Sequence, residues 1–333
     1  MAEPAPAALL SQRLKTRAHE MGFELAGVCS AGEPETWPFY ADWVAQGRHA
    51  GMDYLVRSLE LRKSLDSILP GTKSVLAVGL NYNHHLVHRE GQPKIARYAQ
   101  GRDYHPLFRK TLSRLSKELS LDYPDGEFRA VADSAPLLER EWAQRAGLGW
   151  PGKNTCLIHS QKGSWFLLGF LLTTLEAEPD EPAKGGCGTC RLCIEACPTG
   201  AIIFDQDRWQ VDSNQCISYW TIENKGPIPS PIAENLSGWT FGCDICQEVC
   251  PFNQPRDSQP QRAQQATHPD LKPKQWPNLQ QLAQISYEDW DAMTQGSPVR
   301  RRGWQGIRWN AQACLGLAQE PTAGGRGEPT DDL

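Results

Sequence analysis

The stretch CGTCRLCIEACP occupies residues 187–198 and spaces four cysteines as C-x2-C-x2-C-x3-C-P. In bacterial ferredoxins with this spacing, the first three thiolates hold one [4Fe–4S] cluster and the fourth ligates a second cluster. A second run, CDICQEVCP at 243–251, repeats the last three cysteines and has Thr240 where the first would stand. Cys216 is the only cysteine between the two runs and completes a set of eight. The spacing therefore predicts two clusters with four thiolates each.

The crossed arrangement of such ferredoxins assigns the ligands to two groups. The first group is Cys187, Cys190, Cys193 and Cys250. The second group is Cys197, Cys216, Cys243 and Cys246. A pair of structural zinc sites is the alternative, because C-x2-C pairs also bind zinc, but zinc does not require two C-P endings. The other three cysteines, Cys29, Cys156 and Cys314, are expected to be buried thiols.

The rest of the composition describes an ordinary globular chain. It has 333 residues, 40% of them hydrophobic and 22% charged, with a net charge of −5. This charge argues against a general nucleic-acid coating protein but leaves room for a local basic patch. No apolar run reaches the ~18 residues that span a bilayer, and residues 1–10 lack the basic and apolar regions of a secretory signal. We expect a cytoplasmic protein without a membrane partner, whose clustered cysteines bind metal rather than form disulfides.

Hydrophobic periodicity predicts helices and strands on both sides of the cysteines. Strands are expected at 74–80, 128–132 and 165–175, and helices at 9–21, 136–146 and 308–318. Residues 176–186 are rich in proline, glycine and acid and predict a linker. The sequence GLGWPG at 147–152 matches G-x-G-x-x-G, but it follows a predicted helix and contains a proline, so we reject a dinucleotide site there. The motif D-x-H-x-x-G of corrinoid proteins is also absent, because Phe108 stands at its last position.

Beyond these patterns, the chain resembles the epoxyqueuosine reductases over roughly residues 10–315. The resemblance depends on ARYAQGRDYH (96–105), VADSAPLLERE (131–141), RAGLGWPGKN (145–154), CISYWTIENKG (216–226) and the two cysteine runs. It implies reduction of epoxyqueuosine to queuosine at the wobble position of tRNA by cobalamin, with electrons relayed through two [4Fe–4S] clusters. It also implies an external donor of flavodoxin or ferredoxin type and a monomer.

The implied fold class is α+β. A nitroreductase-like cobalamin-binding domain is expected at 1–176, a ferredoxin-like two-cluster module at 177–254, and a short C-terminal HEAT-like helical segment at 255–319. Residues 320–333 are expected to form a disordered tail. The chain departs from the family in having fewer C-terminal repeat helices than longer members, and in having Ala96 where some members place a cysteine near the cobalt.

Asp133 is the candidate proton donor. It follows a predicted strand and has apolar neighbours, so we expect burial to raise its pKa, as a general acid requires. The alternative is a helix N-cap at Asp133 or Ser134, which the residue pattern alone favours; the resemblance instead implies the catalytic role. It further implies that seven residues lie near the cofactor: Arg62, Ala96, Leu157, Ser218, Gly226, Asp244 and Ile245. For Arg62, a solvated surface charge is the alternative.

The segment VRRRGWQGIRW at 299–309 is the best candidate for an RNA contact. Positive side chains neutralise phosphates and aromatic rings can stack on unpaired bases. The candidate residues are Arg300, Arg301, Arg302, Arg308 and, outside the segment, Lys225. A solvated helix end would show the same pattern.

Two other functions fit the cysteine pattern. One is another corrinoid and iron–sulfur reductase, such as a reductive dehalogenase, and the other is a non-catalytic ferredoxin-type electron carrier. Cobalamin binding would distinguish the carrier from the enzymes, and dependence on tRNA would distinguish the two enzymes.

Overall fold

A four-stranded antiparallel sheet forms the centre of the N-terminal half. The computed structural model describes residues 5–259 and 262–319, and the expected tail at 320–333 lies outside them. The strand order is β1-β2-β7-β4, and each neighbouring pair is antiparallel. The strands are β1 (Leu25–Ser30), β2 (Ser74–Asn81), β4 (Phe128–Val131) and β7 (Phe166–Thr173). The three predicted strands are therefore confirmed, and the class is α+β.

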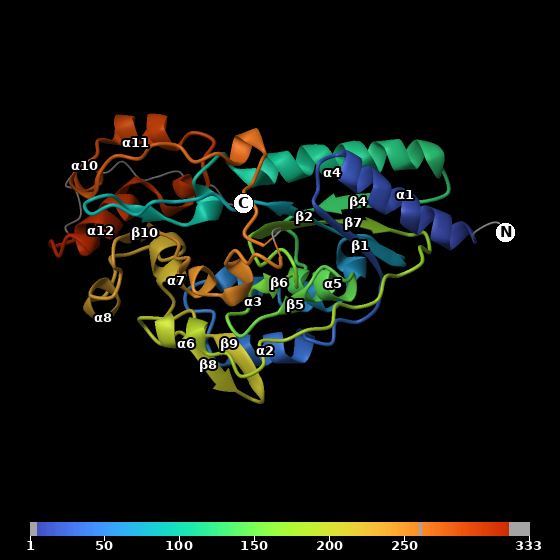
Figure 1. Cartoon of the computed structure of the whole chain (residues 1–333), viewed down its shortest axis with the longest axis horizontal. Helices are drawn as coiled ribbons and strands as arrows, with labels where there is room; N and C mark the ends of the chain where they lie inside the picture. The colour runs from blue at the N-terminus through green and yellow to red at the C-terminus, as the bar shows by residue number, and fades with distance from the viewer. Residues whose placement is uncertain (1–4, 260–261, 320–333) are drawn as a thin grey trace.

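Helices cover both faces of this sheet (Figure 1). The long helices α1 (Pro6–Glu20) and α4 (Tyr104–Asp122) cover one face, and α5 (Glu139–Arg145) covers the other. Side chains of β2 alternate accordingly: Leu76 and Val78 pack with α1 and α4, while Val75 and Ala77 pack with α5. Because both faces are covered, every residue of β2 is buried, which explains its continuous apolar sequence.

Two predicted helices are present with shifted ends. The helix expected at 136–146 begins only at Glu139, with Leu138 as its N-cap, so neither Asp133 nor Ser134 caps it. The helix expected at 308–318 is α12 (Trp304–Cys314), which begins after Gly303 in a left-handed conformation with φ 74°. Gly147 has φ 80° directly after α5 and ends that helix, as expected for a C-terminal stop.

The cysteine-rich module consists of short elements around turns. The predicted linker at 176–186 has no helix or strand, yet it is packed: the Asp180 carboxylate accepts hydrogen bonds from Lys15 (2.5 Å) and from the Val28 amide (2.8 Å). Short elements of the module are α6 (Leu192–Ala196), β8 (Ile202–Asp205), β9 (Arg208–Val211), α7 (Ile217–Ile222), α8 (Ser230–Ala233) and α9 (Ile245–Glu248). Four other short elements come earlier in the chain: α2 (Trp37–Ala45), α3 (Asp53–Arg57), β5 (Trp150–Pro151) and β6 (Leu157–Ile158).

The C-terminal helices join the module to the N-terminal half. A parallel pair of short strands, β3 (Lys94–Ile95) and β10 (Trp239–Phe241), lies beneath them. The helices α10 (Leu279–Ala283), α11 (Tyr287–Thr294) and α12 bury a shared cluster over this pair, to which Ile95 and Phe241 contribute. Distant parts of the chain therefore meet in one core. Within residues 5–259 and 262–319, no helix is long and apolar enough to cross a membrane.

Candidate active site and cluster pockets

The first group of cysteines surrounds a pocket. Cys187, Cys190, Cys193 and Cys250 all line it, together with Asn154 and Phe252. The one-turn helices α6 and α9 each lead into a Cys-Pro step, so the chain turns away after the last thiol of each run. Burial, followed by the other three thiols of the group, raises the pKa of Cys193 to about 11. Four thiols facing one pocket fit the corners of a [4Fe–4S] cluster.

The thiols of the second group also lie near one another. Burial is the largest cause that raises the pKa of Cys243, and the nearby thiols Cys197 and Cys216 raise it further. Cys246 lies close to Cys243 and Cys216, and also to Cys156, with which it shares a hydrogen bond. The crossed grouping is therefore the one in which the thiols lie near one another. Within the described part of the chain, no three His, Cys, Asp or Glu side chains converge on a single metal ion.

The two residues that follow the rejected dinucleotide motif form hydrogen bonds with these cysteine loops. Lys153, directly after it, donates hydrogen bonds to the carbonyls of Gly188 (2.7 Å) and Cys190 (2.8 Å). Asn154 donates to the carbonyl of Cys246 (3.1 Å). The segment leads into the β5–β6 hairpin rather than into a helix, which confirms that it is no dinucleotide fingerprint.

Asp133 lies in an acid–base cluster built from three segments. Its backbone has φ 52°, unusual for a residue with a side chain, and its amide donates to Glu139 (2.8 Å). Its Oδ2 atom lies 2.7 Å from Nε2 of His105. The Nδ1 atom of His105 lies 2.6 Å from Oδ1 of Asp103, the N-cap of α4. The left-handed turn thus directs the Asp133 carboxylate toward His105.

The expectation of a raised pKa for Asp133 is wrong. Burial is the largest influence and would raise the pKa, but hydrogen bonding to His105 and the charges of His105 and Arg301 together hold it below its ordinary value. The Asp133 side chain also remains 51% exposed. Burial opposes the charged form of His105 most strongly, yet Asp103 and Asp133 raise its pKa to about 9. At neutral pH the proton of this pair therefore resides on His105.

Glu139 carries a second perturbed carboxyl. Burial, followed by the charge of Asp133, raises the pKa of Glu139 to about 7. The sequence assigned no role to Glu139 or His105, although both occur in stretches that carry the family resemblance, VADSAPLLERE (131–141) and ARYAQGRDYH (96–105).

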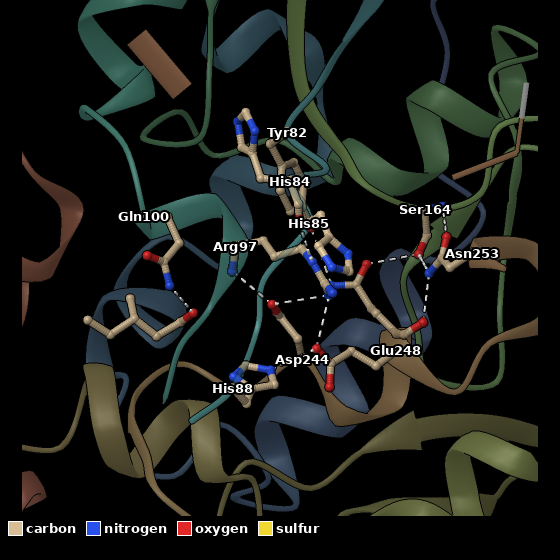
Figure 2. Close-up of polar contacts among 12 residues, drawn as sticks. Tyr82, His84, His85, His88, Arg97, Gln100, Ser164, Asp244, Glu248 and Asn253 are labelled. Carbon is tan, nitrogen blue, oxygen red and sulfur yellow. Dashed lines mark hydrogen bonds and ion pairs between the residues drawn. The ribbon is translucent and has the colours of Figure 1, made fainter. Parts of the chain in front are cut away.

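Asp244 is buried, and Arg97 holds it in place (Figure 2). Its Oδ2 atom accepts a hydrogen bond from the Arg97 amide (2.8 Å), while the Arg97 guanidinium lies 3.1 Å from Glu248 and stacks on Trp165. Burial raises the pKa of Asp244 to about 7. Figure 2 shows the Arg97 side chain extended between the two acidic residues.

The other residues expected near the cofactor occupy varied environments. Arg62 is half-buried and donates to the Leu137 carbonyl (2.9 Å), so it is not a free surface charge. Ala96 and Leu157 are buried. The remaining three, Ser218, Gly226 and Ile245, are half-buried.

The arginines of the predicted RNA segment differ sharply in exposure. Arg300 is 42% exposed and pairs with Asp291 (2.6 Å). Arg301 is 45% exposed, pairs with Glu223 through two hydrogen bonds (2.7 and 2.9 Å) and lies close enough to Asp133 to influence its charge. Arg302, in contrast, is buried, and its guanidinium donates to the carbonyls of Asn224 and Gly226.

The last two predicted RNA contacts, Arg308 and Lys225, also differ in exposure. Arg308 is half-buried, stacks on Trp304 and donates to the Ile285 carbonyl (3.3 Å). Lys225 is exposed. Of these residues, Arg301 is the one whose exposed positive charge influences Asp133.

Two groups of four cysteines, joined to an α+β domain with an acid–base cluster, define an iron–sulfur oxidoreductase. Comparison with known proteins agrees. Residues 186–253 match the family model for a 4Fe-4S double cluster binding domain, and residues 62–134 match the model for epoxyqueuosine reductase QueG, DUF1730. The chain therefore contains a double-cluster binding domain.

Relatives extend the match over almost the whole chain. Epoxyqueuosine reductase of Synechococcus sp. strain RCC307 is 41% identical over 88% of this chain and 89% of its own length. The Escherichia coli K12 protein of the same name is 36% identical over 96% of this chain and 84% of its own length. The chain belongs to the epoxyqueuosine reductase family.

Solved structures agree with this assignment. The epoxyqueuosine reductase of Streptococcus thermophilus matches with a TM-score of 0.80 and 27% identity, over 91% of this chain and 80% of that one. An epoxyqueuosine reductase crystallised with an epoxyqueuosine-modified tRNA-Tyr stem loop matches with a TM-score of 0.78 and 26% identity, over 92% and 81% of the two chains.

Proposed function

We propose that the protein reduces epoxyqueuosine to queuosine in the anticodon loop of tRNA. The observation that carries this proposal is the Asp133–His105 pair, which provides an acid–base group in a chain of this family that also has two groups of four thiols. The reaction converts an epoxide to an alkene, so the substrate gains two electrons and two protons and loses its oxygen as water. Asp133 is proposed as the group that gives a proton to that oxygen.

The eight grouped cysteines would hold two [4Fe–4S] clusters, which pass single electrons. Cobalamin would supply the two-electron chemistry, and the residues proposed to hold it are those of the resemblance, including Arg62, Leu157 and Asp244. One observation fits a large group beside Gly226: apart from that residue and its two chain neighbours, no atom of the described residues lies within 4 Å of where a side chain there would begin. We also propose that residues 1–176 form a nitroreductase-like domain.

The surroundings of the site suggest how it meets its partners. Arg300, Arg301 and Lys225 are proposed to contact tRNA phosphates, with Arg308 beside them and the HEAT-like helices α10–α12 as their support. The electron donor is proposed to be of flavodoxin or ferredoxin type. We further propose that the protein is cytoplasmic, because its proposed substrate is tRNA, and that it is a monomer, as the resemblance implies.

The test compares wild type with Asp133→Asn, both loaded with clusters and cobalamin under anaerobic conditions. An epoxyqueuosine-containing tRNA stem loop is incubated with each protein and a chemical reductant, then digested and analysed by mass spectrometry. Wild type should form queuosine, and Asp133→Asn should retain iron and cobalamin but lose about 10²-fold in rate, since a positioned acid contributes ~10²–10⁴-fold. Asp122→Asn is the matched control, because Asp122 forms an exposed ion pair with Arg13 at the surface. Absence of queuosine with fully loaded wild type would contradict the proposal.

A further inference from the structure

His105 is held at both ring nitrogens by carboxylates from different segments. Asp103 Oδ1 lies 2.6 Å from Nδ1 and also accepts the His105 backbone amide (2.9 Å). Asp133 Oδ2 lies 2.7 Å from Nε2. The Tyr104 ring stacks on the imidazole, with ring centroids 4.2 Å apart and planes at 23°. The ring is therefore fixed in position and orientation.

We propose that His105 is the proton relay of this site: it passes the proton from Nε2 to Asp133, and Asp133 delivers it to the substrate oxygen. This inference depends on the proposed function and deepens it. In each transfer, the Nε2–H bond of His105 breaks as the Oδ2–H bond of Asp133 forms. The Asp133 O–H bond then breaks as an O–H bond forms at the departing oxygen. Solvent returns the proton to His105, and two such transfers balance the oxygen lost as water.

The relay explains how a carboxyl with a lowered pKa can act as an acid. At neutral pH an isolated Asp133 would be ionised and would have no proton to give. His105 is protonated at that pH, because the two carboxylates outweigh the effect of burial. Asp103 holds the other ring nitrogen. Burial is the largest influence on its pKa and would raise it, but the hydrogen bonds to His105 and the charges of His105 and Arg109 together lower it, so Asp103 stays ionised and keeps the charge on the ring.

Several charged and titratable groups surround the His105–Asp133 pair. Acidic groups are Asp103, Asp133, Glu139 and Glu223; basic groups are Arg109 and Arg301; tyrosines are Tyr54, Tyr98 and Tyr104. Among them, only Asp103 and Asp133 form hydrogen bonds with the imidazole nitrogens. His105 acts through Asp133 and is therefore a positioning residue.

The first test is the pH dependence of the single-turnover rate for His105→Gln. The Gln amide can still donate to Asp133 but carries no titrating proton. We expect wild type to keep its rate from pH 6 to 8 and to lose it near pH 9. The variant should lose about 10²-fold at pH 7, bind the stem loop as wild type does, and fall about tenfold per pH unit from 6 to 8. A variant profile parallel to that of wild type would show a purely structural role and overturn the relay.

Asp103→Asn provides a graded perturbation. It removes one of the two negative charges from His105, so the alkaline limb of the rate profile should move to lower pH while the Asp133 contact remains. His19→Gln, at the end of α1, is the matched control, because the His19 ring forms a hydrogen bond with the Phe23 carbonyl and not with the Asp133 cluster. If the alkaline limb of the rate profile stays at the wild-type pH in Asp103→Asn, the relay is contradicted.

A second measurement does not require activity. The imidazole of His105 can be titrated by NMR in the loaded, oxidised protein, with His105→Gln identifying its signal. The midpoint should lie near pH 9 in wild type and shift down in Asp103→Asn. A midpoint near the ordinary value of ~6.5 would overturn the relay. Failure of the proposed function would instead appear as wild type that forms no queuosine while His105 still titrates near pH 9.

Discussion

Arg302→Ala should destabilise the protein without changing its electrostatic attraction to RNA. Arg302 is only 6% exposed, and its guanidinium donates to the carbonyls of Asn224 and Gly226 and to the side chain of Asn310 (3.2 Å). The Gly226 carbonyl keeps a second donor, the Asn224 side-chain amide (2.6 Å), so truncation removes this donor from the Asn224 carbonyl and the Asn310 side chain without such a replacement. At ~1 kcal/mol for each of these two groups, the free energy of unfolding should fall by about 2 kcal/mol.

The neighbouring Arg300 provides the matched comparison. Arg300→Ala removes a half-exposed ion pair with Asp291, which contributes ~0–1 kcal/mol. Stability is measured by anaerobic urea unfolding followed by circular dichroism, and RNA affinity by titration of a fluorescent stem loop at several salt concentrations. If Arg300 neutralises a phosphate, its loss should reduce the slope of log affinity against log salt by ~1. Arg302→Ala should leave the slope unchanged while the protein stays folded. Wild-type stability together with a reduced slope in Arg302→Ala would refute this reasoning.

Further predictions concern the clusters and the second carboxyl. Cys197→Ala should halve the iron content, whereas Cys29→Ala, a buried thiol outside both groups, should keep it; equal iron in both variants would remove Cys197 from the ligand set. Lys153→Met should speed loss of iron to a chelator, because it removes two hydrogen bonds to the loop of the first cysteine group; unchanged kinetics would count against that role. Glu139 has a pKa raised to about 7, so the native state holds a proton that the unfolded state releases near pH 4.5. Stability should therefore fall as pH rises from 4.5 to 7, and Glu139→Gln should flatten this trend in urea unfolding; an unchanged trend would contradict it.

The parts of the fold that the sequence could predict are those with local signals. The cysteine runs are local, because each set of three thiols lies within about ten residues, so spacing alone indicated the crossed grouping. The strands β2 and β7 were predictable because sheets covered on both faces have continuous apolar strands. The start of α5 was not predictable, since the left-handed turn at Asp133 and the Pro136 that follows delay the helix to Glu139.

The candidate site was predictable only in part, because its geometry is not local. Apolar neighbours in the sequence indicated a buried Asp133, but its pKa depends on His105, which lies 28 residues earlier in the chain. Among the RNA candidates, consecutive arginines look equivalent in sequence. They face different surroundings because Pro298–Arg302 forms a 3-10 helix, in which successive side chains point about 120° apart.

The lowered pKa of Asp133 limits which proton transfers are possible. A carboxyl that is ionised at neutral pH cannot serve as a stored acid, yet the reaction proposed here consumes two protons. Among the described residues, the cation that forms a hydrogen bond with the Asp133 carboxylate is His105; the charge of Arg301 also lowers the pKa of Asp133, but a guanidinium does not release its proton at neutral pH. Of these two cations, only the imidazole can therefore pass a proton to Asp133. Asp103 favours this route, because it keeps His105 charged at the pH where Asp133 is not protonated.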